Sequence, residues 1–308
     1  MPGADKTVVL PSAPASVGSR PPSLLLRART HPGMLAGGIV LLVIVLVAVF
    51  APLLAPHDPY AQNLLNRRTP PVWFGWLYGS PRASWTHPLG TDAIGRDFLS
   101  RLIYGSRISL VVATVATALS AMIGITLGLV GGYYGKTVDS IVSFVIMTRL
   151  SMPLTLVALA VVALFGGSTV IVVLVLGLLL WDRFAVVIRA ETQRLRDAEY
   201  VRAAKAIGCS TPHILFRQVL PNLSGPLVVV ATYEMGIVIL TEAGLSFLGM
   251  GVQPPTPSWG QMLSEARSEI LFHSWMIVLP GVAIFILVYC INLVGDGLRD
   301  ILEPRGRA

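Results

Sequence analysis

A glycine-rich stretch at residues 131–137, Gly-Gly-Tyr-Tyr-Gly-Lys-Thr, contains the residue types of a nucleotide phosphate site. In a phosphate-binding loop, backbone N–H groups surround the phosphates and a Lys contacts them. That motif needs a Gly five residues before Gly135, and Val130 occupies the position. No strand pattern precedes the stretch, so we interpret it as a short turn between two helices. We therefore expect no ATP site in this chain, and any ATP would be bound by another chain.

The histidines, cysteines and serines lack the spacing of a metal site or a catalytic nucleophile. The five histidines are His31, His57, His87, His213 and His273. They lie in loops and termini, with no pair four residues apart and no neighbouring Cys, so a dedicated metal site is not expected. Cys209 and Cys290 are too few for a disulfide framework, and no Gly-x-Ser-x-Gly motif is present. The sequence thus predicts no metal, no cofactor and no catalysis in this chain.

Charged residues inside apolar stretches are the remaining candidates for chemistry. Arg149 and Glu234 fall at similar depths in two such stretches. A lone ionised group inside a bilayer costs about 2.5–3.5 kcal/mol on insertion scales, so it usually faces the bundle interior and finds a partner. We hypothesise that both face a pathway and either pair or meet a solute's charged ends, with a purely structural pair as the alternative. Glu242 is a weaker candidate, because it can hydrogen-bond within the helix bundle.

The elements that position these residues are predicted membrane spans. The chain has 308 residues, of which 54% are hydrophobic and 13% charged, against about 25% charged in soluble domains. A helix needs about 20 apolar residues to cross a bilayer. Six stretches qualify, at residues 34–54, 108–130, 140–165, 169–188, 227–248 and 275–298. The first starts too late, is too long and lacks the cleavage site of a signal peptide. We therefore expect an all-α integral membrane protein with six transmembrane helices.

Basic residues predict the orientation of these spans. With the N-terminus in the cytoplasm, 15 Lys and Arg residues lie in cytoplasmic segments and 7 in outside segments, as the positive-inside rule requires. The predicted organisation is a disordered cytoplasmic tail at 1–33, a first helix at 34–54, a periplasmic segment at 55–107, a five-helix core at 108–298 and a cytoplasmic tail at 299–308. The net charge of +7 is explained by this topology and not by nucleic-acid binding.

Three glycines in the second span predict close helix packing. Gly124, Gly128 and Gly132 recur every four residues. Small residues at this spacing let helix backbones approach each other in lipid.

The polar segment between the fourth and fifth spans, residues 198–222, predicts two short helices joined by a turn. The first helix has four residues on one side, Tyr200, Ala203, Ala204 and Ile207. Gly208 is expected to end it, and Thr211 to cap a second helix with Pro212 in its first turn. The small alanines leave room for another surface to dock. The alternative is a loop lying on lipid headgroups.

The same segment resembles the cytoplasmic EAA loop of permease subunits of bacterial ABC importers. The signature is two alanines, a Gly four positions after the second, and a later Leu-Pro. These positions are held by Ala203, Ala204, Gly208, Leu220 and Pro221. The Glu of the general motif falls on Arg202 and its later Ile on Gln218, departures that occur in the peptide and nickel branch.

Three further segments, residues 87–110, 242–263 and 292–305, are similar to the C-type permease of dipeptide, oligopeptide and nickel importers. The resemblance covers about residues 31–305. The chain departs from this family along the third and fourth spans. Phe144, Met147 and Met152 stand where Arg and Asp are usual before Pro153, and the Arg expected at Val186 is found at Arg183. These departures leave the solute open.

The resemblance implies a type I ABC importer permease fold and one of two permease subunits that form a pathway, with dipeptides or oligopeptides as the expected solutes. It implies two cytoplasmic ATPase subunits that bind ATP and Mg²⁺, an extracytoplasmic solute-binding protein, and a bacterial inner-membrane location with both termini cytoplasmic. The chain itself would not be an enzyme. Coupling to the ATPases would involve the loop at 190–222, with Glu199, Tyr200, Arg202, Ala203, Ala204, Gly208, Leu220 and Pro221.

Residues of the outside segments are candidates for contact with the binding protein. They are Asp92, Arg96, Asp97 and Trp259. Local capping, in which Thr91 or Asp92 starts a helix, is the simpler explanation of the charges.

Several alternatives remain open at this point. Nickel or glutathione import is the nearest. A stand-alone secondary transporter would need inverted repeats or paired broken helices, and the sequence indicates neither. A membrane enzyme would need reactive groups clustered at one depth.

Overall fold

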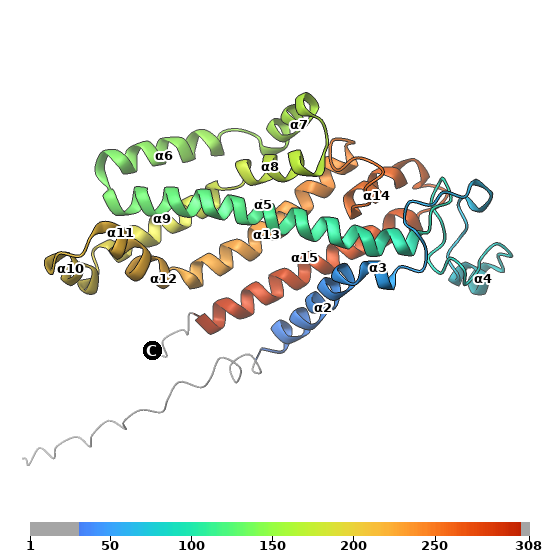
Figure 1. Cartoon of the computed structure of the whole chain (residues 1–308), viewed down its shortest axis with the longest axis horizontal. Helices are drawn as coiled ribbons and strands as arrows, with labels where there is room; N and C mark the ends of the chain where they lie inside the picture. The colour runs from blue at the N-terminus through green and yellow to red at the C-terminus, as the bar shows by residue number, and fades with distance from the viewer. Residues whose placement is uncertain (1–30, 303–308) are drawn as a thin grey trace, which may run out of the picture.

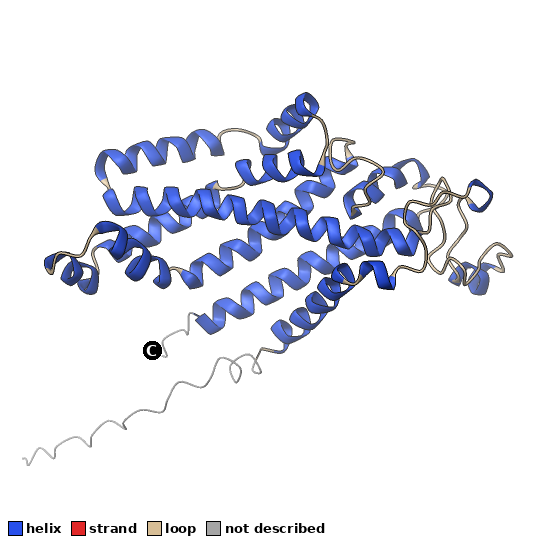
Figure 2. Ribbon diagram, in the orientation of Figure 1, coloured by secondary structure: helices blue, strands red, loops and turns tan. Residues whose placement is uncertain are grey.

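The computed structural model describes residues 31–302, so the predicted tails at 1–33 and 299–308 lie mostly outside the described residues. Regular structure within this range is helical, and no strand occurs there (Figure 2). The long elements are α2 (Pro32–Val49), α5 (Phe98–Tyr134), α6 (Lys136–Leu150), α7 (Leu154–Phe165), α8 (Thr169–Leu179), α9 (Asp182–Arg196), α13 (Ser224–Phe247) and α15 (Trp275–Leu302). The short ones are α3 (Ala51–Leu54), η1 (Leu64–Asn66), α4 (Trp73–Tyr78), α10 (Glu199–Ala206), α11 (Thr211–Ile214), the π-helical turn η2 (Leu215–Val219), α12 (Leu220–Asn222), α14 (Trp259–Ala266) and η3 (Arg267–Glu269).

The described chain has five helical segments long and apolar enough to cross a membrane, and a sixth if α6 and α7 form one span. One of the five combines α8 and α9 across the short break at Leu180–Trp181. The predicted all-α, six-span architecture is confirmed in this form.

The predicted third span at 140–165 is not a single rod. Helix α6 ends at Leu150, α7 starts at Leu154, and the two helices are bent by 79°. Pro153 explains the break, since it lacks a backbone N–H and disfavours helical geometry in Met152 before it. Helices α8 and α9 are also interrupted at Leu180–Trp181, but together they count as one span, so α6 and α7 are the one bent pair among the described residues.

The three glycines bring α5 and α9 into close contact near the C-terminal end of α5. A Cβ added to Gly128 would lie 2.8 Å from Cβ of Ile188, and one at Gly132 would lie 2.7 Å from the carbonyl oxygen of Arg189. Both distances are shorter than carbon atoms tolerate, so only Gly allows this approach. The predicted role of these glycines in helix packing is confirmed.

We expect Gly128→Ala to lower the thermal midpoint of the purified protein, because the new methyl group overpacks the contact between α5 and α9. Overpacking of a tight core typically costs about 1–3 kcal/mol. Gly244→Ala on α13 is the matched control, since a Cβ there meets nothing within 4 Å. Equal midpoints for the two variants would contradict the packing role.

The bundle has two distinct ends (Figure 1). At the α4 end, the loops of residues 55–97 lie beside α14, whereas α10, α11 and α12 form the opposite, α10 end. The first and last described helices run together, and Nδ1 of His31 lies 3.8 Å from Oδ2 of Asp300.

Candidate functional site

A buried carboxylate in the middle of the bundle is paired across the break between α8 and α9. Glu234 on α13 is fully buried. Nε of Arg183, in the first turn of α9, lies 3.1 Å from its Oε1. Neither carboxylate oxygen has a hydrogen bond from residues 31–302, so the contact is an ion pair without hydrogen-bond geometry. Arg183 is therefore the principal counter-charge of Glu234.

The outer side of this pair opens on a groove between α9 and α13. The groove has a volume of about 500 Å³ and is lined by Leu150, Arg183, Val186, Val187, Val229, Val230 and Tyr233. The side chain of Arg183 is 52% exposed, and its Cζ lies 4.6 Å from the centre of the Tyr233 ring. The groove thus presents one cation and one aromatic ring on otherwise apolar walls. Such a surface suits a solute that carries a carboxylate and has some apolar character.

Arg149 lies at the other helix break and has a different partner from the one hypothesised. Its Nε donates to the carbonyl oxygen of Leu179 at 2.7 Å, and its Nη2 donates to the same oxygen. Leu179 is the last residue of α8, and terminal carbonyls of a helix have no partner within the helix. The direct pair of Arg149 with Glu234 is therefore not formed, because the end of α8 occupies Arg149 and Arg183 occupies Glu234.

Glu242 hydrogen-bonds within the bundle. It is 2% exposed, and its Oε1 accepts hydrogen bonds from Oγ of Ser246 at 2.8 Å and Oγ of Ser258 at 3.1 Å. Ser258 also caps the N-terminus of α14, where its Oγ accepts from the backbone N–H of Gln261 at 3.0 Å. Glu242 therefore fastens α14 to α13 and does not line the groove.

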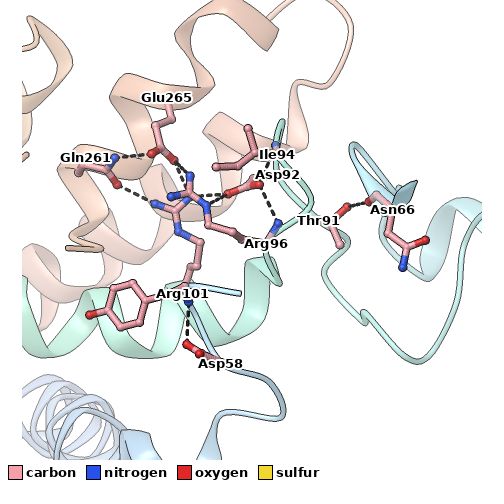
Figure 3. Close-up of polar contacts among 10 residues, drawn as sticks. Asp58, Asn66, Thr91, Asp92, Ile94, Arg96, Arg101, Gln261 and Glu265 are labelled. Carbon is pink, nitrogen blue, oxygen red and sulfur yellow. Dashed lines mark hydrogen bonds and ion pairs between the residues drawn. The ribbon is translucent and has the colours of Figure 1, made fainter. Parts of the chain in front are cut away.

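A buried network of charges joins the start of α5 to α14 at the α4 end (Figure 3). Oδ2 of Asp92 accepts hydrogen bonds from Nε of Arg96 and Nη1 of Arg101, both at 2.6 Å. Arg96 Nη2 also donates to Oε2 of Glu265 at 2.7 Å, and Arg101 Nη2 to Oε1 of Gln261 at 2.8 Å. Arg101 is 1% exposed. The network connects segments more than 160 residues apart in the sequence.

Glu265 remains ionised in this network at neutral pH although it is partly buried. Burial alone would raise the pKa of its carboxyl group, but attraction to and hydrogen bonds from Arg101 and Arg96 outweigh it and hold the pKa below its usual range. A depressed pKa in the folded state stabilises the fold above the unfolded pKa of about 4.3, and this contribution is lost as the pH falls through the folded value.

We expect Glu265→Gln to lower the thermal midpoint at pH 7 and the difference from the unmodified protein to shrink as the pH falls below about 4. Glu191→Gln serves as the control, because its partner Arg194 is 72% exposed and exposed pairs contribute little. A difference that stays constant over the acid range would contradict the role given to the ionised Glu265.

The residues predicted to contact a binding protein are buried inside this chain. Asp92 and Arg96 are each 5% exposed, Asp97 is 2% and Trp259 is 4%. Trp259 Nε1 donates to the carbonyl oxygen of Leu102 at 2.9 Å. In the structure these side chains hold the α4 end together, and their direct contact with a binding protein stays a prediction.

The helix cap at this end also differs from the prediction. Asp97 is the N-cap of α5, and its Oδ2 accepts from the backbone N–H of Ser100 at 2.8 Å. The sequence predicts Thr91 or Asp92 in this role. The exposed side chains near this end include three aromatic ones, Trp76, Tyr78 and Trp85, each more than two-thirds exposed.

Helix α10 ends as predicted. The backbone N–H of Gly208 donates to the carbonyl of Lys205 and that of Cys209 to the carbonyl of Ala204, both at 3.1 Å. Gly208 has a φ of +83°, in the left-handed region that favours Gly. This pair of bonds is a Schellman motif, which stops the helix and turns the chain toward α11.

The faces of α10 are divided differently from the prediction. Val201 and Ala204 are the buried residues and pack on a small core with Leu195 and Ile214. The predicted coupling residues are distributed as follows: Glu199, Tyr200, Arg202, Ala203, Gly208 and Pro221 are exposed, Leu220 is half-buried and Ala204 is buried. With Ile207 81% exposed, α10 has an unpartnered apolar side. Its role in coupling stays a prediction.

The second helix of this segment is irregular. Ser210, and not Thr211, is its N-cap, with Pro212 in the first turn as expected. The π-helical turn η2 precedes α12, which has Pro221 in its first turn. The wider turn accommodates a residue that has no N–H to donate.

The sequence matches two known families. Residues 124–308 match the family described as binding-protein-dependent transport system inner membrane component. Residues 24–71 match the N-terminal transmembrane domain of oligopeptide transport permease C.

Similar proteins cover most of the chain. A dipeptide transport system permease protein of Haemophilus influenzae is 38% identical over 273 residues, 89% of this chain and 90% of the relative. A di/tripeptide transport system permease protein of Pseudomonas aeruginosa is 40% identical, covering 89% and 88%. A glutathione transport system permease protein of Pectobacterium atrosepticum is 38% identical, covering 90% and 88%.

A solved structure shares the fold. It is an inward-facing conformation of the MetNI methionine ABC transporter, with a TM-score of 0.55 and 18% identity over 66% of this chain and 96% of that chain. The predicted type I ABC importer permease fold is confirmed by this likeness, which concerns the fold alone.

Proposed function

This chain belongs to the family of binding-protein-dependent transport system inner membrane components, and we propose that it imports dipeptides or oligopeptides as one of two permease subunits around a shared pathway. The peptide and di/tripeptide names of its relatives support the solute class. Family membership argues against the stand-alone secondary transporter, although the chain has interrupted helices.

The groove between α9 and α13 carries the proposal for the solute. A peptide has a terminal carboxylate, which Arg183 can bind. The ring of Tyr233 packs against the guanidinium group of Arg183. The seven lining residues include no His or Cys, the side chains that favour nickel. The groove therefore supports a peptide over a nickel ion.

The partners follow from the two ends of the bundle. We assign the α10 end to the cytoplasm, where the exposed side of α10 and the turn at Gly208 would dock on one of two ATP- and Mg²⁺-binding ATPase subunits. The α4 end would then face the solute-binding protein outside. Both chain termini would be cytoplasmic, in agreement with the excess of Lys and Arg in these segments.

The test is uptake of labelled dipeptides, tripeptides and glutathione by cells that depend on this chain. We expect Arg183→Gln to reduce peptide uptake by about 10-fold or more, the usual loss when a charge-assisted contact of 1.5–3 kcal/mol is removed. Arg194→Gln, on the same helix but 72% exposed and paired with Glu191, is the matched control.

A second variant separates solute contact from stability. Arg183→Gln leaves Glu234 buried without its counter-charge, which can lower the membrane level of the protein. Arg183→Gln with Glu234→Gln removes both charges and should restore the level without restoring uptake. Normal uptake in the double variant would overturn the role of Arg183, and uptake of glutathione alone would replace peptides as the solute.

A further inference from the structure

Two histidines and an aspartate converge at the α4 end, outside the charge network and the groove. His57 follows α3, His87 lies in the loop after α4, and Asp97 precedes α5. One possible ligand atom from each residue lies within 4.8 Å of the others. Within residues 31–302 this is the group of His, Cys and acidic side chains that could hold a metal ion.

The carboxylate of Asp97 is oriented toward both imidazoles. Its Oδ2 accepts from the N–H of Ser100, which leaves Oδ1 to face the rings. Nδ1 of His87 lies 2.8 Å from Oδ1, and Nδ1 of His57 lies 3.7 Å from the same oxygen. The backbone N–H of His57 donates to Oγ of Ser100 at 3.0 Å, which fixes the backbone beside the site.

One ring nitrogen in this group has no hydrogen-bond partner among the described residues. Nδ1 of His57 is buried from solvent and makes no hydrogen bond with any described residue. A buried polar atom without a partner costs free energy, so its position toward a carboxylate needs a reason. The two rings are 4.8 Å apart between centroids and inclined at 37°, so they do not satisfy each other.

We propose that His57, His87 and Asp97 bind a divalent transition-metal ion of the zinc class. Imidazole nitrogen and carboxylate oxygen are ligands that Zn²⁺ prefers, and three protein ligands with water in the fourth position form a common site. Bonds of about 2.0–2.1 Å in tetrahedral geometry separate the ligand atoms by about 3.3 Å. The ligand atoms lie within 4.8 Å of one another, so ring movements of about 1.5 Å or less reach this spacing. The ion would then satisfy the free Nδ1 of His57.

The site would join three segments of the α4 end. His57 and His87 are 30 residues apart in the sequence, so their spacing does not indicate a shared metal site. The fold brings them together. A bound ion would fasten the loops before and after α4 to the first turn of α5. This site is separate from the proposed solute groove, and its existence does not depend on peptide transport.

The test uses the complete transporter complex, purified without a histidine tag and treated with a chelator. We expect it to bind about one Zn²⁺ per copy of this chain by calorimetry, to gain visible d–d bands with Co²⁺, and to rise in thermal midpoint with Zn²⁺, as binding to the folded state requires. His57→Asn removes a ligand but no side-chain hydrogen bond, so folding should be retained. It should weaken Zn²⁺ binding by more than about 10-fold.

His213→Asn is the matched control, because His213 lies in α11 at the α10 end. It should bind Zn²⁺ and respond to it like the unmodified complex. The proposal is overturned if the unmodified complex takes up no Zn²⁺ or Co²⁺, or if His57→Asn binds them as tightly as His213→Asn.

Discussion

Replacing Arg101 with methionine should destabilise the folded protein by about 3–5 kcal/mol, the usual effect of breaking a buried charge network. Methionine keeps much of the length of the side chain and removes every donor. Asp92 and Glu265 would then share Arg96 as their cation, and Oε1 of Gln261 would lose its bond from Arg101. We expect little monodisperse protein after detergent extraction and a much lower thermal midpoint in what remains.

Arg82→Met is the control for the loss of an arginine at the same end of the bundle. Arg82 is exposed and donates one hydrogen bond, to the carbonyl oxygen of Arg67. Its substitution should change the midpoint little, since exposed contacts contribute little. If both variants were equally stable, the network would not be what holds α14 to α5.

Replacing Gly208 with aspartate should abolish ATPase co-purification and lower uptake by about 10-fold or more, while the protein still reaches the membrane. A side chain at φ +83° is strained by about 1–3 kcal/mol, and the added charge lies where we propose that the ATPase docks. Space is not the obstacle within this chain, because a Cβ at Gly208 meets nothing within 4 Å.

Two further variants separate strain from docking. Gly249→Asp introduces the same side chain at φ +82°, also in open space, but away from residues 198–222. It should leave co-purification unchanged. Gly208→Asn adds no charge and tolerates the left-handed region better, so it should retain more uptake than Gly208→Asp. Normal uptake with an intact complex in Gly208→Asp would refute the docking role. That is the result expected if residues 198–222 are only a loop lying on lipid headgroups.

Local sequence patterns predicted the parts of the fold that depend on near neighbours. The apolar runs identified the spans, the glycine repeat identified a close helix contact, and Gly208 identified the end of α10. Each of these features depends on residues that are close together in the sequence. The break at Pro153 has a local cause too, but the hydropathy of residues 140–165 concealed it.

The partners of charged residues could not be predicted in this way. Glu234 and Arg149 have opposite charge and were expected at similar depths, but Arg183 reaches Glu234 from the break after α8, and a carbonyl at the end of α8 accepts from Arg149. The bonds of Arg101 to α14 and the meeting of His57 with His87 depend on how distant segments fold together. One feature of the sequence pointed to the partner of Glu234, namely the arginine found at position 183 instead of 186.

Helix α5 is much longer than a bilayer is thick. Its 37 residues make a rod of about 56 Å at 1.5 Å per residue, against a hydrocarbon core of about 30 Å. No proline interrupts it. Arg101 lies in its first turn, and Tyr133, near its last residue, has Nζ of Lys205 on α10 4.7 Å from its ring centre.

The helix can therefore act as a lever between the two sides of the membrane. A tilt of about 5° about its midpoint would move each tip by about 2.4 Å, in opposite directions, given the rise of 1.5 Å per residue. A push on α10 would reach α5 through the contact of Lys205 with Tyr133 and would shift Arg101 and the loops around it without any intervening hinge. Opening on one face and closing on the other would then be a single motion of one rigid element.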